Sequence, residues 1–196
     1  MARRPRIWYE GASYHITCRG NHQNDIFNDR SDYKVYLRIL EKVKGELDFN
    51  LCAYCLMTNH VHLLIQTKES SISDIMKKIN MLYVNYYNRK YNKVGRLFQG
   101  RYGAKLIGDH AYLLELSRYI HLNPVRANIV EKPEEYEWSS YSMYIGLMRE
   151  KLIHSEDILD RFAAHKSRSI YKEFVEMGMR KDKVSYDDYG DMSIIS

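Results

Sequence analysis

The sequence predicts an α+β fold of the ferredoxin-like type, a split sheet with helices on one face and the other face free to bind. Two observations predict it. Short segments with alternating apolar residues are typical of strands, and longer segments with an apolar residue every three to four positions are typical of helices. Along the chain these segments follow the order β-α-β-β-α-β-α, which is the order of a split sheet followed by one more helix.

The strands are indicated by alternation and by turn residues at their ends. Gly20-Asn21 ends the first strand, and Thr58-Asn59 separates the second from the third, which predicts a hairpin. The last strand contains glycine. The four predicted strands are residues 13–19, 51–57, 60–67 and about 97–107.

The helices are indicated by apolar stripes and capping residues. Asp29 or Ser31 can cap the first helix, and Asp109 caps the third, which we expect to stop at Asn123-Pro124. The second helix has the clearest stripe. The stripes are Tyr36, Leu37, Leu40, Val43 and Leu47 in the first helix, Ile72, Ile75, Met76, Ile79, Tyr83, Tyr86 and Tyr87 in the second, and Tyr112, Leu113, Leu116, Tyr119 and Ile120 in the third.

The chain is expected to divide into one domain, residues 1–148, and a helical, polar C-terminal extension, residues 149–196. Of the 30 basic and 25 acidic residues of the whole chain, the extension holds 9 and 10, which leaves 21 and 15 for the domain. Helical segments are predicted at about 156–164 and 169–179 within the extension.

Composition excludes several classes of protein. The 18 Tyr, 5 Phe and 2 Trp are too many for a disordered chain, and no apolar run is long enough to span a membrane. Three cysteines do not form a disulfide framework typical of secreted proteins, and no signal peptide is visible. We therefore expect a cytoplasmic protein.

Basic and aromatic residues gather in one stretch that has no acidic residue, Ile75 to Gly108. Lys and Arg neutralise phosphates, and aromatic rings stack on unpaired bases. The other interpretation is a solvated basic face above core tyrosines. The residues predicted to bind DNA are Lys77, Lys78, Arg101, Tyr102 and Lys105.

The sequence His60-Val61-His62 lies in a predicted strand. Residues two apart in a strand point to the same face, so both imidazoles can converge on one cation. Val61, Leu63 and Ile65 then face the helices on the other side. Two ordinary histidines on a half-exposed face are the alternative, because a bare His-x-His is common.

Tyr119 and Asn123 are four residues apart and share one face of the third helix. The amide oxygen of Asn123 can bind a metal or a phosphate. Alternatively, Tyr119 extends the core stripe and Asn123 only precedes the proline. Taken alone, this pair is a weak signal, and alternation adds only the expectation that the sheet face of His60 and His62 is open to solvent.

Two His-x-Thr/Ser sequences, His15-Ile16-Thr17 and His165-Lys166-Ser167, could indicate a phosphoesterase with paired motifs. The second sequence lies between predicted helices of the extension, not in a strand. This interpretation is therefore disfavoured, and His15 receives no role from it.

The motifs taken together resemble the HUH single-tyrosine transposases, the insertion-sequence-200-like family, and within it the branch of REP-associated tyrosine transposases. The resemblance covers about residues 8–145. The segments that carry it are Asn59-His60-Val61-His62-Leu63-Leu64, residues 95–102 (GRLFQGRY), residues 119–127 (YIHLNPVRA) and residues 137–141 (EWSSY).

The resemblance implies a ferredoxin-like endonuclease and strand transferase that acts on single-stranded DNA. Tyr119 matches the nucleophile, and His60, His62 and Asn123 match the metal ligands, with Mg²⁺ or Mn²⁺ as the cation. Asn at the third position, where the insertion-sequence branch typically has Gln, points to the REP-associated branch. The implied partner is hairpin-bearing, REP-like single-stranded DNA, and the protein is a monomer or a homodimer.

Two other classes of function remain open from the residues alone. One is a non-catalytic ferredoxin-like module that binds single-stranded nucleic acid and needs neither Tyr119 nor a metal. The other is a metal-dependent phosphoesterase that uses water as the nucleophile.

Overall fold

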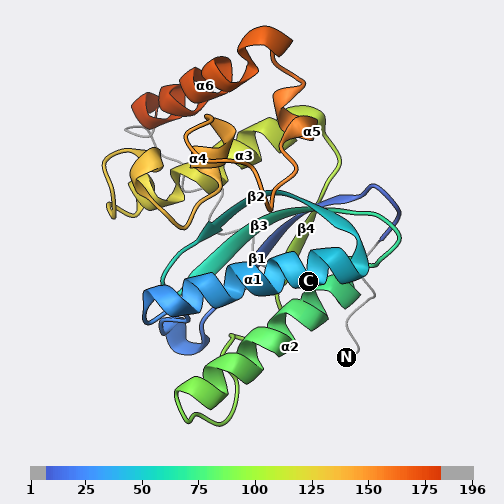
Figure 1. Cartoon of the computed structure of the whole chain (residues 1–196), viewed down its shortest axis with the longest axis vertical. Helices are drawn as coiled ribbons and strands as arrows, with labels where there is room; N and C mark the ends of the chain where they lie inside the picture. The colour runs from blue at the N-terminus through green and yellow to red at the C-terminus, as the bar shows by residue number, and fades with distance from the viewer. Residues whose placement is uncertain (1–7, 182–196) are drawn as a thin grey trace.

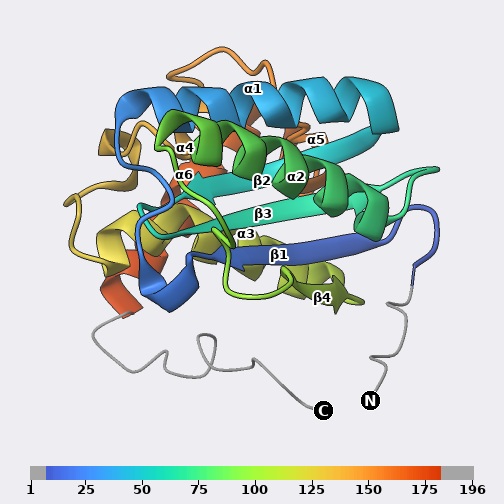
Figure 2. The ribbon, with the colours of Figure 1, turned by 90° about the horizontal axis from the view of Figure 1, so that it is seen from below.

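The four strands form one antiparallel sheet. The computed structural model describes residues 8–181. The strands are β1 (Ser13–Arg19), β2 (Phe49–Leu56), β3 (His60–Thr67) and β4 (Gly103–Ile107), in the sheet order β2-β3-β1-β4 (Figure 2). Every neighbouring pair is antiparallel. The last strand is shorter than predicted, because around Phe98 the chain forms only an isolated bridge with Gly20.

Three long helices connect and follow the strands in the predicted order. They are α1 (Arg30–Leu47), α2 (Ile72–Lys90) and α3 (His110–Arg126). Asp29 caps α1 in a capping box with Asp32, and Asp109 caps α3 by accepting from the amide of Ala111. Contrary to the prediction, α3 does not stop at Pro124 but continues to Arg126, because only one intrahelical hydrogen bond is lost so close to its end.

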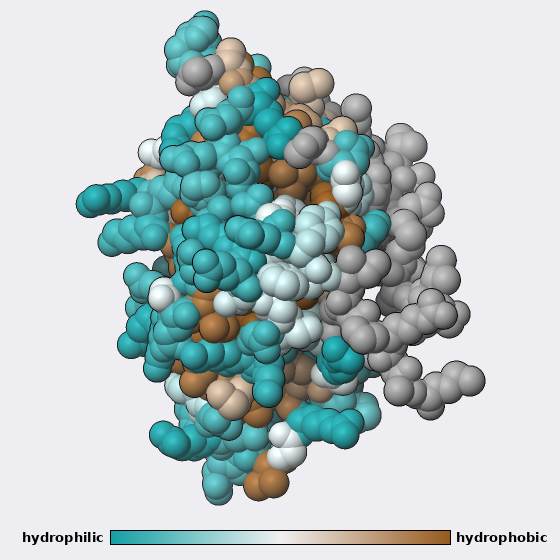
Figure 3. Space-filling model, turned by 90° about the vertical axis from the view of Figure 1, so that its right-hand side faces the viewer, coloured by the Kyte–Doolittle hydropathy of each residue, from teal (hydrophilic) through white to brown (hydrophobic). Residues whose placement is uncertain are grey.

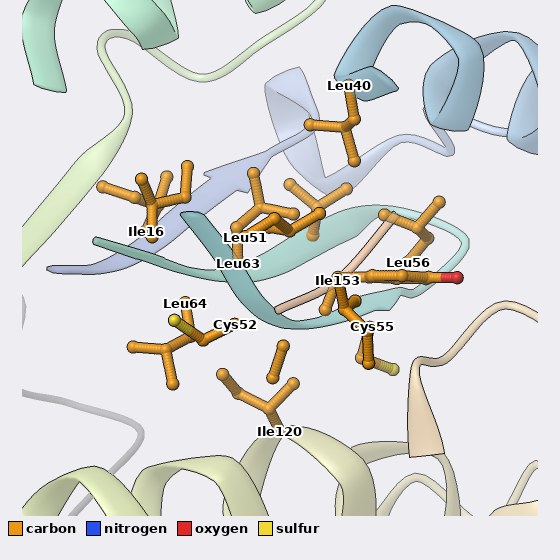
Figure 4. Close-up of a cluster of buried hydrophobic side chains, with 14 of the residues drawn as sticks. Ile16, Leu40, Leu51, Cys52, Cys55, Leu56, Leu63, Leu64, Ile120 and Ile153 are labelled. Atoms are coloured by element: carbon orange, nitrogen blue, oxygen red, sulfur yellow. The ribbon is translucent and has the colours of Figure 1, made fainter. Parts of the chain in front are cut away.

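The helices lie on both faces of the sheet, so the prediction of one free face is wrong. Figure 1 shows α1 and α2 on one side of the sheet and α3 on the other. In the core, Leu40 of α1 and Ile120 of α3 lie on opposite sides of β2 and β3 (Figure 4). The physical reason is that β2 and β3 are apolar on both faces. Their residues from Leu51 to Met57 and from Val61 to Ile65 are all buried, a near-continuous run typical of a strand covered on both sides.

The segment after α3 folds over the outer side of that helix (Figure 1). Its helices are α4 (Tyr141–Tyr144), α5 (Glu156–Leu159) and α6 (Ser167–Lys181). Three short 3₁₀ turns complete the described chain, at Asn21–Gln23, Pro133–Glu135 and Ala164–Lys166. The helix predicted at 169–179 is thus found as α6, whereas the one predicted at 156–164 is a single turn. Residues 182–196 of the predicted extension lie outside the described residues.

α6 approaches α3 closely at Gly178. A Cβ atom at this position would lie 2.8 Å from Leu122 Cδ1 and 2.9 Å from Arg118 Cδ. Glycine therefore permits the close contact between the two helices. The buried side chains of Tyr171 and Val175 complete the contact from α6.

A buried network of side-chain hydrogen bonds connects α3 to β2 and α6. His121 Nδ1 lies 2.7 Å from Tyr171 Oη, and His121 Nε2 lies 2.7 Å from Ser140 Oγ. Tyr171 in turn donates to Ser117 Oγ at 3.0 Å, and Ser140 Oγ accepts from the amide of Tyr54 at 2.9 Å. Burial lowers the pKa of His121 to about 3, so its ring is neutral and offers one donor and one acceptor.

The side of the molecule shown in Figure 3 is mainly polar. Hydrophilic residues dominate there, and apolar residues form small separate groups. Among residues 8–181, no helix is both long and apolar enough to cross a membrane.

Replacing His121 by alanine is expected to lower the free energy of unfolding by about 2–4 kcal/mol. The variant leaves the hydroxyls of Ser140 and Tyr171 buried with one partner fewer and opens a cavity. Urea unfolding at pH 7.5 measures the change. The control is His154→Ala, whose imidazole is partly exposed and should change stability by less than about 0.5 kcal/mol. If His121→Ala and His154→Ala unfold at the same urea concentration, His121 does not stabilise the contact of α3 with β2 and α6.

Candidate active site

β3 presents the two histidines on the sheet face covered by α3. Val61 and Leu63 alternate with them and are buried. His60 is half-buried, and His62 is only 6% exposed. The predicted alternation is therefore present, but the expectation that both imidazoles lie on an open face is wrong, because α3 lies across them.

α3 brings Tyr119 and Asn123 to the histidine pair, as predicted. The ring centroid of Tyr119 lies 5.5 Å from that of His62, and the His60 and His62 centroids are 4.9 Å apart. Asn123 Nδ2 donates to the backbone oxygen of Tyr119 at 2.8 Å, and the Asn123 side chain also hydrogen-bonds to His62. Residues from one strand and one helix, about 60 positions apart in sequence, thus form a single cluster.

Hydrogen bonds orient both imidazoles. His60 Nδ1 lies 2.6 Å from Asn59 Oδ1, and His62 Nδ1 lies 3.0 Å from Nε2 of His15 on β1. Burial, with a smaller effect of Arg19, lowers the pKa of His60 to about 4. Burial also holds the pKa of His62 well below its usual value. The imidazoles are therefore neutral near pH 7, as metal-ligating histidines must be.

The donors available to a metal are two imidazoles and one amide oxygen. Among the described residues, no group of three or more His, Cys, Asp or Glu side chains could hold a metal ion, so a cation bound to His60 and His62 would take Asn123 as a further ligand. Nδ1 of each histidine is engaged in a hydrogen bond, while Nδ2 of Asn123 is engaged with α3. His60 Nε2, His62 Nε2 and Asn123 Oδ1 form the mixed nitrogen and oxygen set that a cation would bind, in place of the hydrogen bond between His62 and Asn123, and such a set fits Mg²⁺ or Mn²⁺.

Cationic side chains also lie beside Tyr119. The guanidinium carbon of Arg126 lies 5.0 Å from the Tyr119 ring centroid, in cation–π geometry. A cavity adjoins the tyrosine, and Lys105 Nζ donates to the hydroxyl of Tyr112 at its wall, at 3.0 Å. The cavity is lined by His15, Tyr112, Glu115, Leu116, Arg118, Tyr119 and Arg126.

Sequence reasoning did not assign His15 and Arg126 to this site. Arg126 follows Tyr119 by seven residues, two helical turns, and this spacing could have placed it on the same helix face. His15 has no comparable signal, because its position depends on β1 pairing with β3 in the observed register.

The residues predicted to bind DNA are dispersed by the fold. Lys105 lies opposite His15 in the β1–β4 register and shares its sheet face. Arg101 is exposed just before β4. Lys77 and Lys78 lie on α2, on the other face of the sheet, and Lys78 forms an ion pair with Glu46 of α1.

The position of Tyr102 contradicts the expectation that its ring stacks on DNA bases. Its side chain is 8% exposed, and its hydroxyl lies 3.3 Å from Ser73 Oγ at the start of α2. The ring faces are therefore covered by protein, and the sequence pattern of interleaved tyrosines reflects core packing at this position.

The comparison with protein families and the comparison with curated proteins both find transposases. The family model described as "Transposase IS200 like" matches residues 9–123. A curated protein of Haemophilus influenzae, provisionally named a REP-associated tyrosine transposase, is 29% identical over 108 residues. That match covers 47% of this chain and 59% of the relative, so it spans less than two thirds of the relative's length.

One solved structure shows the same fold. The structure titled as a REP-associated tyrosine transposase bound to a REP hairpin aligns with a TM-score of 0.64 at 15% identity, over 79% of this chain and 94% of the other. A transposase-like protein of Deinococcus radiodurans aligns at 18% identity with a TM-score of only 0.43, over 61% and 95% of the two chains.

Acid is expected to destabilise the fold through the site histidines. In the folded chain the pKa of His60 is about 4, below the value of about 6.5 in an unfolded chain. Neutral His60 therefore contributes fully to the free energy of unfolding above pH 6.5. This contribution falls as the pH decreases from 6.5 to 4, by at most about 1.4 kcal/mol per pH unit, and is lost below pH 4. Urea midpoints at roughly pH 7, 6 and 5 test this, and His60→Gln should show a shallower decline. If the wild-type midpoint does not change with pH, or if the variant declines as steeply as the wild type, the assignment of a lowered pKa to His60 is contradicted.

Proposed function

Because the chain belongs to the family of IS200-like transposases, we propose that it nicks and rejoins single-stranded DNA through a covalent 5′-phosphotyrosine at Tyr119. The observation that carries the proposal is the cluster of Tyr119, Asn123, His60 and His62. A core tyrosine stripe gives no reason for a half-buried Tyr119 to lie against the neutral imidazole of His62 and the guanidinium of Arg126.

The residues of the chain define the chemical step. The phenolic oxygen of Tyr119 attacks the scissile phosphorus and releases its proton to solvent, while the P–O3′ bond breaks and the 3′ oxygen leaves as a hydroxyl after taking a proton. The Arg126 guanidinium packs over the Tyr119 ring in cation–π geometry and holds the ring in place. The ester retains the bond energy, so a 3′-hydroxyl of another strand can attack it and restore the phosphodiester.

His60, His62 and Asn123 would hold the cation of this site, Mg²⁺ or Mn²⁺. When bound, such a cation polarises the scissile phosphate and stabilises the charge that develops on its oxygens. The contribution of the chain is to keep both imidazoles neutral and oriented, through burial and through the bonds to Asn59 and His15.

Hairpin-bearing single-stranded DNA is the proposed substrate. The solved transposase of similar fold is described as bound to a REP hairpin, which supports the same class of ligand for this chain. The strand would reach Tyr119 from the side of Lys105 and Arg126, because these cationic side chains lie beside the tyrosine. Lys77 and Lys78 lie on the far face and would not contact the scissile segment.

Tyr119→Phe is expected to abolish the covalent adduct with a labelled hairpin oligonucleotide and to leave binding intact. Phenylalanine keeps the ring packing and removes only the nucleophilic oxygen. His60→Ala and His62→Ala should also prevent adduct formation, and Asn123→Ala should leave partial activity that depends on the metal concentration, since water can replace one oxygen ligand.

The matched control is Tyr86→Phe, which removes a hydroxyl bonded to Asp32 on the opposite side of the sheet and should keep full adduct formation. Adduct formation by Tyr119→Phe at the wild-type level would refute the nucleophile. Cleavage by the wild type without an adduct would indicate a hydrolase, and retention without cleavage would indicate a binding module.

Lys105→Gln is expected to weaken binding of the same DNA and to reduce its salt dependence by about one phosphate contact. Lys78→Gln removes an equal charge from the far face, where the lysine is already paired with Glu46, and should leave both quantities nearly unchanged. Fluorescence anisotropy across a series of salt concentrations measures affinity and slope together. If Lys78→Gln weakens binding as much as Lys105→Gln, the strand follows α2 instead.

A further inference from the structure

His15 is a half-buried site residue that the proposed mechanism leaves without a defined role. It lies on β1, and its Cα partners are Leu64 on β3 and Lys105 on β4. Two positions further along β1, Thr17 lies opposite His62. His15 and His62 are thus diagonal neighbours on the same sheet face, at a spacing that long side chains can bridge.

The two imidazoles meet edge to edge. His15 Nε2 lies 3.0 Å from His62 Nδ1, the ring planes differ by 19°, and the centroids are 5.2 Å apart. For a nitrogen contact of this length, that separation is nearly the largest the two rings permit. The two nitrogens therefore point straight at each other in nearly one plane, which is the geometry of a directed hydrogen bond rather than of face-to-face stacking.

Such a bond contains one proton and one lone pair, and its direction decides which nitrogen of His62 is available. If His62 Nδ1 carries the proton, His62 Nε2 presents a lone pair to a cation. If His15 donates instead, the proton of neutral His62 is on Nε2 and blocks that atom. His60 shows the first arrangement, because its Nδ1 faces the acceptor Asn59 Oδ1, while Asn59 Nδ2 donates to the backbone oxygen of Gln23.

We propose that His15 is a positioning residue, which accepts the Nδ1 proton of His62 and so keeps His62 Nε2 free to bind the cation. The inference rests on the proposed metal site of His60, His62 and Asn123. Ligating histidines commonly donate their second ring nitrogen to a partner that fixes the tautomer and the ring orientation. In this chain, Asn59 does so for His60 and His15 for His62.

Mn²⁺ binding, followed by the electron paramagnetic resonance signal of the free ion, tests the inference without any measurement of DNA cleavage. His15→Phe keeps an aromatic ring between β1 and α3 but has no acceptor, and we expect it to weaken Mn²⁺ binding by about 10–100-fold. His15→Gln can place an amide oxygen near the position of Nε2, and we expect it to retain affinity within a few-fold. Circular dichroism confirms that both variants are folded.

Further measurements make the outcomes decisive. Electron spin echo modulation should detect two imidazole nitrogens on Mn²⁺ in the wild type and in His15→Gln, whereas three in the wild type would make His15 a ligand and overturn the proposal. In the wild type with Mg²⁺, ¹⁵N spectra should show a proton on His62 Nδ1 and none on His15 Nε2, and the reverse would overturn it. The spectra also decide the matter if His15→Phe does not fold.

The inference and the proposed function fail separately. Wild-type Mn²⁺ affinity in His15→Phe refutes the positioning role alone. A wild-type chain that binds no Mn²⁺ refutes the metal site and the role of His15 with it, and Tyr119 is tested independently by the covalent adduct.

Discussion

The packing of α3 across the second face of the sheet is the constraint on which the candidate site depends. The helix uses three sides at once. Ile120 is buried against β2 and β3, His121 and Gly178 join the helix to its outer neighbours, and Tyr119 is left to face the histidines of β3. Because a helix is rigid over one turn, the contacts of the first two sides set the position of the third.

Much of this arrangement could be predicted from the sequence, because strand alternation and helical spacing depend only on residues that are close in the sequence. Alternation placed His60 and His62 on one face, helical spacing placed Tyr119 beside Asn123, and both relations are present in the structure. The covering of the second sheet face was missed, although the unbroken apolar run from Leu51 to Met57 indicates it. Alternation in the other strands instead predicts one free sheet face.

The partners of individual polar residues could not be predicted, because they depend on tertiary register. Lys78 counts as a free charge in the sequence and is paired with Glu46 in the fold. Tyr102 lies among basic residues in the sequence and is buried beneath α2 in the fold. His15 becomes a neighbour of His62 only through the β1–β3 pairing, which brings together residues 47 positions apart.

The buried hydrogen bond between His121 and Tyr171 determines how truncated relatives of this sequence should be judged. All four residues of the candidate site lie before residue 124, but α3, which carries two of them, is fastened by an outer helix that begins at Ser167. A stop codon after Tyr141 and before Ser167 would leave every motif readable while removing the support of α3. Intact motifs in a truncated relative are therefore weak evidence of activity, and the presence of the distal tyrosine and glycine is a better criterion for a working copy.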